Sequence, residues 1–212
     1  MLLPLSLALL AACTQRAADA PPAATATVIP ATSGDGSGRT DDGKPFDNDA
    51  SAVVGQPAPS WRIDTWLNGP PVTLEDLRGH VVFVRWFMGT ACPMCSATAP
   101  SLNILHDKYG PRGLSVVGMY HHKDPQPLDV ATVKGYVAKF GFQFPVGIDT
   151  DWLTLKRYWL DGHENRKFTS VSFLIDKKGV VRHVHLGGEL APGDPAFKSI
   201  ERYVEALLAE PG

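Results

Sequence analysis

Two cysteines, Cys92 and Cys95, are separated by two residues at the expected start of a helix. An apolar run over residues 81–87 precedes them and indicates a buried strand, and residues 93–109 are expected to be helical. Thiols at this spacing lie close enough to form one disulfide, and the free amides and positive dipole end of a helix N-terminus stabilise a thiolate. A strand that leads such a pair to a helix start is typical of a dithiol redox centre.

The two thiols are expected to differ. Cys92 should be the exposed nucleophile, and Cys95, one turn into the helix, should be more buried. Pro93 and Met94 carry no charge, so the helix dipole is the main visible acidifier of Cys92. A structural zinc half-site and an inert disulfide are the alternatives. Zinc needs four ligands and the chain has no second cysteine pair, so redox chemistry is favoured and we expect neither a metal nor a cofactor.

Length and composition fit one medium-sized globular domain. The chain has 212 residues, of which 44% are hydrophobic and 20% charged, with a formal net charge of −2. The near-neutral balance argues against nucleic acid as a partner. No apolar stretch is long enough for a mature transmembrane helix.

Residues 1–13 are expected to form a targeting segment. They are apolar, too short to span a bilayer, and end in small residues before Cys13. Residues 10–13 resemble the lipobox of bacterial lipoproteins, which implies that Cys13 is a lipid attachment point that tethers the protein to a membrane. No Lys or Arg precedes the apolar run, and an ordinary cleaved signal is the alternative. Either interpretation predicts an extracytoplasmic, periplasmic protein, where thiols meet oxidising conditions.

Residues 14–52 are expected to form a disordered linker. The segment is rich in Ala, Pro, Thr, Gly and Asp and has almost no large apolar side chains to bury. A flexible tether of this length spans on the order of 35 Å. The folded domain is predicted over residues 53–212.

The pattern of the domain is strand–helix alternation followed by a hairpin and a last helix. Strands are expected around residues 61–63, 81–87, 114–120, 144–148, 171–175 and 180–186, and helices over 93–109, 130–140, 152–160 and 195–209. This order predicts an α/β fold with a central mixed sheet flanked by helices.

Three segments carry a resemblance to a known family. Residues 54–60, residues 74–80 with the following strand and dithiol, and residues 172–181 resemble the thioredoxin fold, and within it the membrane-tethered TlpA-like thiol–disulfide reductases and their redoxin relatives. The resemblance implies Cys92 as nucleophile and Cys95 as resolving thiol. It also implies protein disulfide or dithiol clients and an upstream electron donor, and it favours reduction.

The chain departs from that family at three positions. Ala91 stands where the family has Trp before the first cysteine, and Trp86 stands where a buried acid assists proton transfer. Ser170 takes the place of the cis-proline. A cis bond before a non-proline residue costs about 2.5–4 kcal/mol, so we expect a trans peptide there.

Other polar residues have both structural and functional interpretations. Arg85 is expected to reach the sheet edge or a carboxylate, with a role as a cation near the thiolate as the alternative. His121 follows a strand at the end where α/β active sites gather, but a surface histidine is the favoured interpretation. His183 and His185 alternate along a strand and are expected on a solvated face.

Two rival functions use the same residues. A Sco-type copper chaperone would hold copper with Cys92, Cys95 and a histidine such as His121. That family has Cys-x-x-x-Cys spacing, however, and this chain has one residue fewer between its cysteines. A peroxiredoxin needs Thr three residues before the reactive cysteine, where this chain has Gly89, with Thr90 one place off.

Overall fold

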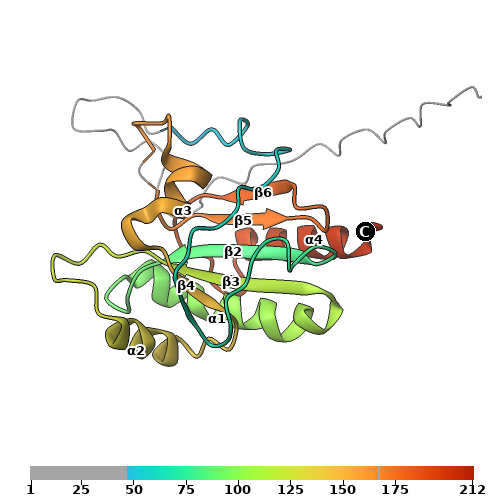
Figure 1. The fold of residues 1–212 in the computed structure, drawn as a ribbon. Helices are drawn as coiled ribbons and strands as arrows, with labels where there is room; N and C mark the ends of the chain where they lie inside the picture. The colour runs from blue at the N-terminus through green and yellow to red at the C-terminus, as the bar shows by residue number, and fades with distance from the viewer. Residues whose placement is uncertain (1–46, 167) are drawn as a thin grey trace, which may run out of the picture.

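A computed structural model describes residues 47–166 and 168–212, and within them a single six-stranded sheet in the order β1-β4-β3-β2-β5-β6 (Figure 1). The strands are β1 (Thr65–Leu67), β2 (Val81–Phe87), β3 (Leu114–Tyr120), β4 (Val146–Ile148), β5 (Ser172–Ile175) and β6 (Val181–His185). The pairs β2·β3 and β3·β4 are parallel, whereas β1, β5 and β6 run antiparallel to their neighbours. The expected mixed sheet flanked by helices is confirmed.

The longer helices form the parallel crossovers and close the chain. They are α1 (Pro93–Tyr109), α2 (Val130–Phe140) and α4 (Pro195–Ala209), and a short α3 (Leu153–Leu155) lies between the 3₁₀ turn Thr150–Trp152 and the wider π-type turn Lys156–Leu160. Both crossovers, β2-α1-β3 and β3-α2-β4, place their helix on the same side of the sheet, as two right-handed connections in one direction require.

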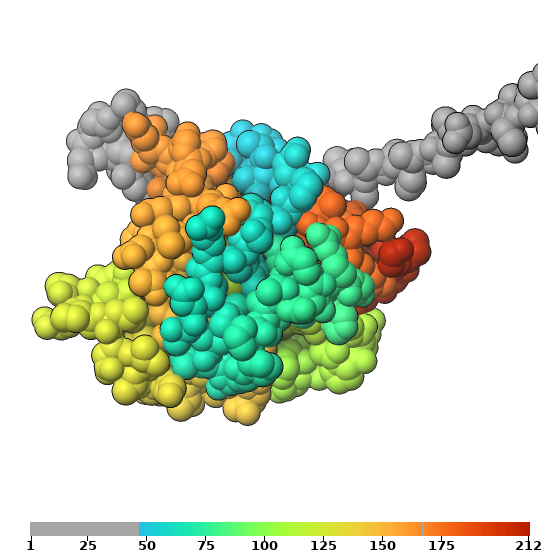
Figure 2. Space-filling view, in the orientation of Figure 1, coloured from blue at the N-terminus to red at the C-terminus, as the bar shows by residue number. Residues whose placement is uncertain are grey.

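Each face of the sheet has its own core because side chains alternate along the strands. Alternate residues of β2, among them Phe83 and Phe87, pack with α1, α2 and α4 in one cluster. Trp86 and its alternates on β2 pack with the α3 region and the chain before β2 in the other. Figure 2 shows part of this second covering layer, with the segment before β2 in blue to teal beside the orange residues around α3.

Two expected elements are wrong. The first strand is Thr65–Leu67 rather than residues 61–63, because the backbone of Arg62 is bound by a side chain instead: its N–H donates to Thr154 Oγ1 at 2.9 Å and its carbonyl accepts from the same hydroxyl at 3.3 Å. The single helix expected over residues 152–160 is broken, since Trp152 has a φ of +59° and the turn that follows α3 is wider than an α-helix.

The residues just before residue 53 also pack on the domain. Ala50 is fully buried, and the guanidinium of Arg166 donates to the carbonyl of Asp49 and lies 3.3 Å from the carboxylate of Asp47. Residues 47–52, which the sequence assigns to the end of the linker, therefore contact the domain. The targeting segment, Cys13 and the rest of the expected linker lie outside the described residues. None of the described helices is both long enough and apolar enough to cross a membrane.

Candidate redox site

Cys92 is the N-cap of α1, where the strand-to-helix connector ends. Its backbone is extended (φ −84°, ψ 109°), and its Sγ accepts a hydrogen bond from the N–H of Cys95 at 3.2 Å. Pro93 occupies the first helical turn, where a missing N–H costs no hydrogen bond. The chain thus aims a helix N-terminus at the Cys92 sulfur, which is the arrangement that stabilises a thiolate.

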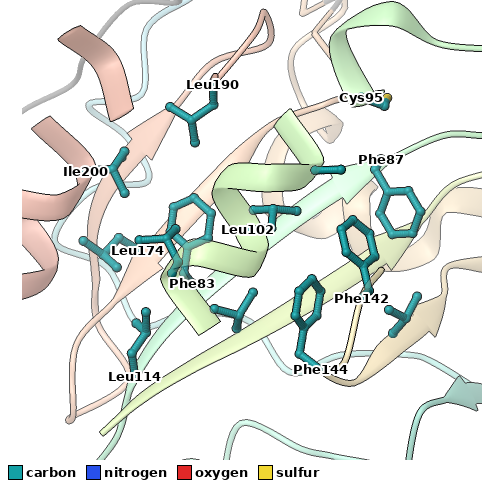
Figure 3. Packing of buried hydrophobic residues seen from close by; sticks show 14 of the residues in the cluster. Phe83, Phe87, Cys95, Leu102, Leu114, Phe142, Phe144, Leu174, Leu190 and Ile200 are labelled. Atoms are coloured by element: carbon teal, nitrogen blue, oxygen red, sulfur yellow. The ribbon is translucent and has the colours of Figure 1, made fainter. Parts of the chain in front are cut away.

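Both sulfurs are largely covered. Cys92 is 8% exposed and Cys95 4%, so the expectation of an exposed Cys92 is wrong and only the order of exposure holds. Both are free thiols in this structure. Figure 3 shows Cys95 near Phe87, at the start of α1 and close to the end of β2. Its Sγ accepts a hydrogen bond from the N–H of Met88 at 3.4 Å.

The pKa of the Cys95 thiol is raised to about 11, first by burial and then by its hydrogen bond with Cys92. The Met88 N–H and the charge of Arg85 act in the opposite direction. The Cys95 thiol is therefore protonated near pH 7 in this structure.

The expectation that Arg85 reaches the sheet edge or a carboxylate is wrong. Arg85 is 1% exposed, and its guanidinium donates to Ser172 Oγ and to the carbonyl of Gly188, both at 3.1 Å. Burial lowers its pKa to about 10, against the charges of Cys95 and Cys92, which raise it. The Arg85 guanidinium is therefore close enough to Cys95 and Cys92 to interact with their charges.

A second cation, Lys123, follows β3 and was not singled out from the sequence. Burial lowers its pKa, while the charges of Cys92 and Cys95 raise it. Its ammonium also lies 5.5 Å from the ring centroid of Trp152. Only its position shortly after a strand that ends beside β2 could have indicated it.

The three histidines expected at the surface are buried, so that interpretation is wrong. Burial lowers the pKa values of His121 and His185 to about 3 each, and both are neutral near pH 7. A ring nitrogen of His121 lies 3.0 Å from Thr169 Oγ1. His183 stacks on Tyr203 of α4 at a centroid distance of 4.7 Å.

The position of the missing acid has a structural explanation. Trp86 points to the face away from α1, and its ring N–H donates to Asp149 Oδ2 at 2.8 Å. Asp149, which follows β4, also accepts from the backbone N–H groups of Thr154 and Leu155. The hydrogen bonds of this buried carboxylate therefore go to Trp86 and to the backbone of α3.

Of the remaining predicted residues, Thr90 lies beside the helix start. The carbonyl of Thr90 accepts a hydrogen bond from Ser96 Oγ at 3.2 Å. Thr90 and Ser96 also border a hollow of about 280 Å³, whose other lining residues are Ala99, Pro100, Lys139 and Phe140. Ser170 is 8% exposed, and the described peptide bonds include no cis bond, so its peptide is trans as expected.

A buried dithiol at a helix start, on a parallel strand–helix–strand unit, defines a thiol–disulfide exchange centre. The redoxin family model matches residues 53–203, so the chain belongs to the redoxin family. It is 34% identical over 154 residues to the thiol-disulfide oxidoreductase ResA of Bacillus anthracis, covering 73% of this chain and 78% of that protein. It is 31% identical over 158 residues to Protein DipZ of Mycobacterium tuberculosis, covering 71% of this chain but 20% of DipZ.

Solved structures agree with this assignment. A thiol-disulfide isomerase from Corynebacterium glutamicum is 28% identical with a TM-score of 0.57, covering 73% of this chain and 98% of that one. A thioredoxin-like protein in the oxidized form is 27% identical with a TM-score of 0.59, covering 74% and 97%. The fold is thioredoxin-like, and the protein is a thiol–disulfide oxidoreductase.

Proposed function

We propose that the protein reduces disulfides of protein clients outside the cytoplasm, with Cys92 as nucleophile and Cys95 as resolving thiol. The carrying observation is the asymmetry of the pair: the Cys92 sulfur accepts a hydrogen bond from the N–H of Cys95 in the first turn of α1, whereas the more buried Cys95 has a raised pKa. A thiolate at Cys92 attacks a client disulfide and forms a mixed disulfide. Cys95 then attacks the Cys92 sulfur, and the client leaves as a dithiol.

The reaction leaves a Cys92–Cys95 disulfide, which an upstream dithiol donor must reduce before the next turnover. The reductive direction rests on the resemblance to TlpA-like reductases. The hollow bordered by Thr90 and Ser96 adjoins the start of α1. It is a place where client side chains could lie while the sulfurs exchange.

The proposed location follows from residues 1–13. Removal of an apolar leader at Cys13 and acylation of that residue would tether the domain to a bacterial membrane. The polar segment that follows would hold the domain in the aqueous compartment.

Trapping of intermediates tests the assigned roles. Cys95→Ser lacks the resolving thiol, so a mixed disulfide on Cys92 should persist and accumulate with a model client such as oxidised insulin. Cys92→Ser is the matched control and should trap little. Equal yields of adduct from the two variants would contradict the roles.

The rival functions are separated by parallel assays on the same protein. A copper site would need a histidine beside the thiols, and the described part of the chain holds no group of three His, Cys, Asp or Glu side chains suited to a metal. Copper titration and peroxide consumption, run beside insulin reduction, distinguish the three. Tight Cu(I) binding or rapid peroxide turnover without insulin reduction would refute the proposal.

A further inference from the structure

The side chain of Arg85 lies on the thiol side of the sheet. Its alternates on β2, Phe83 and Phe87, pack in the same cluster as Cys92 and Cys95, whereas the intervening residues of β2 pack on the opposite face. Figure 3 shows Phe83 and Phe87 on the side of the sheet that α1 covers, with Cys95 in the first turn of that helix. Arg85 therefore lies between two core aromatic residues of β2, on the same face of the sheet as the helix that carries the dithiol.

The partners of Arg85 leave its charge uncompensated. Ser172 is its direct cross-strand neighbour on β5, and Gly188 follows β6, and both offer neutral oxygens. No carboxylate in the described part of the chain pairs with this guanidinium. A guanidinium stays protonated in proteins, and a buried ion without a counter-charge is costly. A cation at this position calls for an anion, and the groups nearby that can become anionic are the two thiols.

We infer that Arg85 is the counter-charge of the Cys95 thiolate during resolution of the mixed disulfide. This inference rests on the proposed function, in which Cys95 is the resolving thiol. The role is electrostatic positioning, since the hydrogen bonds of Arg85 go to Ser172 and Gly188 and not to a sulfur.

The charge matters most once Cys92 is in a mixed disulfide. Two of the causes that raise the pKa of Cys95 are the hydrogen bond and the negative charge of Cys92, and both change when Cys92 becomes part of a disulfide. Burial remains, and the charge of Arg85 opposes it. The pKa of Cys95 should therefore fall at the stage where its thiolate is needed.

The step balances without a protein base. The Cys95 proton passes to water, the Cys95 thiolate attacks Cys92 Sγ, the Cys92–Cys95 bond forms and the Cys92–client bond breaks. The client sulfur leaves with the electron pair and takes a proton from water, so the dithiol is oxidised and the client reduced by two electrons.

Other charged or titratable groups face this region from each neighbouring element. His121 at the end of β3 and His185 on β6 are neutral near pH 7, with pKa values lowered to about 3 by burial and, to a lesser extent, by Arg85. Lys123 in the loop after β3 is the other cation that interacts with both thiols. Arg85 is the buried one, where a charge acts with less screening.

The test follows the two halves of a single turnover with an aromatic disulfide that releases a coloured thiolate. The first release reports attack by Cys92, and the second reports resolution by Cys95. In Arg85→Gln, loss of the charge should raise the pKa of the resolving thiol. For each unit by which that pKa rises, the thiolate fraction falls tenfold while its nucleophilicity partly compensates, so the second release should slow by about 3-fold per unit at neutral pH. Above the new pKa the second release should be as fast as in wild type or faster.

Two further variants serve as controls. Arg85→Lys keeps a charge and should lie between Arg85→Gln and wild type. Arg166→Gln removes another buried guanidinium, one on which neither thiol acts, and should leave the pH profile of the second release unchanged.

Ultraviolet titration of the Cys95 thiolate replaces the kinetics if Arg85→Gln does not fold. In the Cys92→Ser background, Arg85→Lys substitutes a compact ammonium that cannot reproduce the two hydrogen bonds of the guanidinium fork. The displaced charge should raise the pKa of Cys95 relative to the same background with Arg85. An unchanged pKa would overturn the inference.

The outcomes separate the two claims. If wild type shows no second release, the proposed roles of the cysteines fail. If wild type shows it and folded Arg85→Gln keeps the wild-type pH profile, only the inference about Arg85 is overturned. A uniform slowing at every pH would also overturn it, because that indicates a structural effect of the substitution.

Discussion

Asp149→Asn tests whether the buried carboxylate near Trp86 is structural. Oδ2 accepts from the Trp86 ring N–H and the Leu155 N–H, both at 2.8 Å, and Oδ1 accepts from the Thr154 N–H at 2.9 Å. An asparagine whose carbonyl replaces Oδ2 keeps two of these bonds without charge assistance, and its NH₂ faces the Thr154 N–H. Charge-assisted bonds are about twice as strong as neutral ones, and an unsatisfied buried donor costs about 1–3 kcal/mol, so we expect a loss of about 3 kcal/mol.

The measurements are urea unfolding for the free energy of unfolding, thermal unfolding for Tm, and the pH profile of thiol release. A loss of about 3 kcal/mol in a domain of this size lowers Tm by roughly 6–12 °C. Asp151→Asn is the control, because Asp151 is exposed and its φ of +56° suits asparagine, so it should stay within about 0.5 kcal/mol of wild type. We expect the pH profile of both thiol releases in Asp149→Asn to match wild type. Full stability with a shifted pH profile would refute this reasoning and make Asp149 a proton acceptor for the thiols.

Two further predictions concern acid stability and the membrane anchor. The folded-state pKa values of His121 and His185 are lowered to about 3, so the unfolded chain binds more protons below its histidine pKa. Stability present above about pH 6.5 should therefore be lost as pH falls, by up to about 2.7 kcal/mol per pH unit for the pair. Urea midpoints between pH 7 and 5 check this: His185→Phe should reduce the slope, and a flat wild-type profile would contradict it. Cys13→Ala should move the protein from the detergent phase to the aqueous phase, or leave it unprocessed, with domain activity unchanged. A wild-type protein found wholly in the aqueous phase with unmodified Cys13 would refute the anchor.

The central elements were predictable because each has a strong local signal. The apolar runs of β2 and β3 and the helical spacing of α2 gave the observed bounds at residues 81–87, 114–120 and 130–140. The helix expected over residues 93–109 has the observed bounds of α1, with Cys92 as its N-cap and Pro93 in its first turn. These signals depend on neighbours along the chain, and so they survive without knowledge of the tertiary structure.

The predictions that failed, for the first strand and for the exposure of the histidines, depend on contacts between residues far apart in the sequence. Thr154 binds the backbone of Arg62 across the chain and replaces the strand expected there. The buried ring of His121 contacts Thr169 and Trp152, both more than 30 residues further along the chain. A polar residue in a strand carries the same pattern whether its face is covered or solvated, so periodicity cannot decide which of the two it is.

A shift of one position along β2 changes both the sign and the side of the charge near the dithiol. In the family that the chain resembles, the position of Trp86 carries an acid, and here that side chain points away from the thiols toward Asp149. The adjacent Arg85 points the other way, into the cluster that contains Cys92 and Cys95. A carboxylate could accept the proton of the resolving thiol, whereas a guanidinium can only stabilise the thiolate that remains. If Cys95 resolves the mixed disulfide as proposed, its proton must leave through water, and the rate of resolution depends on how much the buried charge lowers the free energy of the Cys95 thiolate.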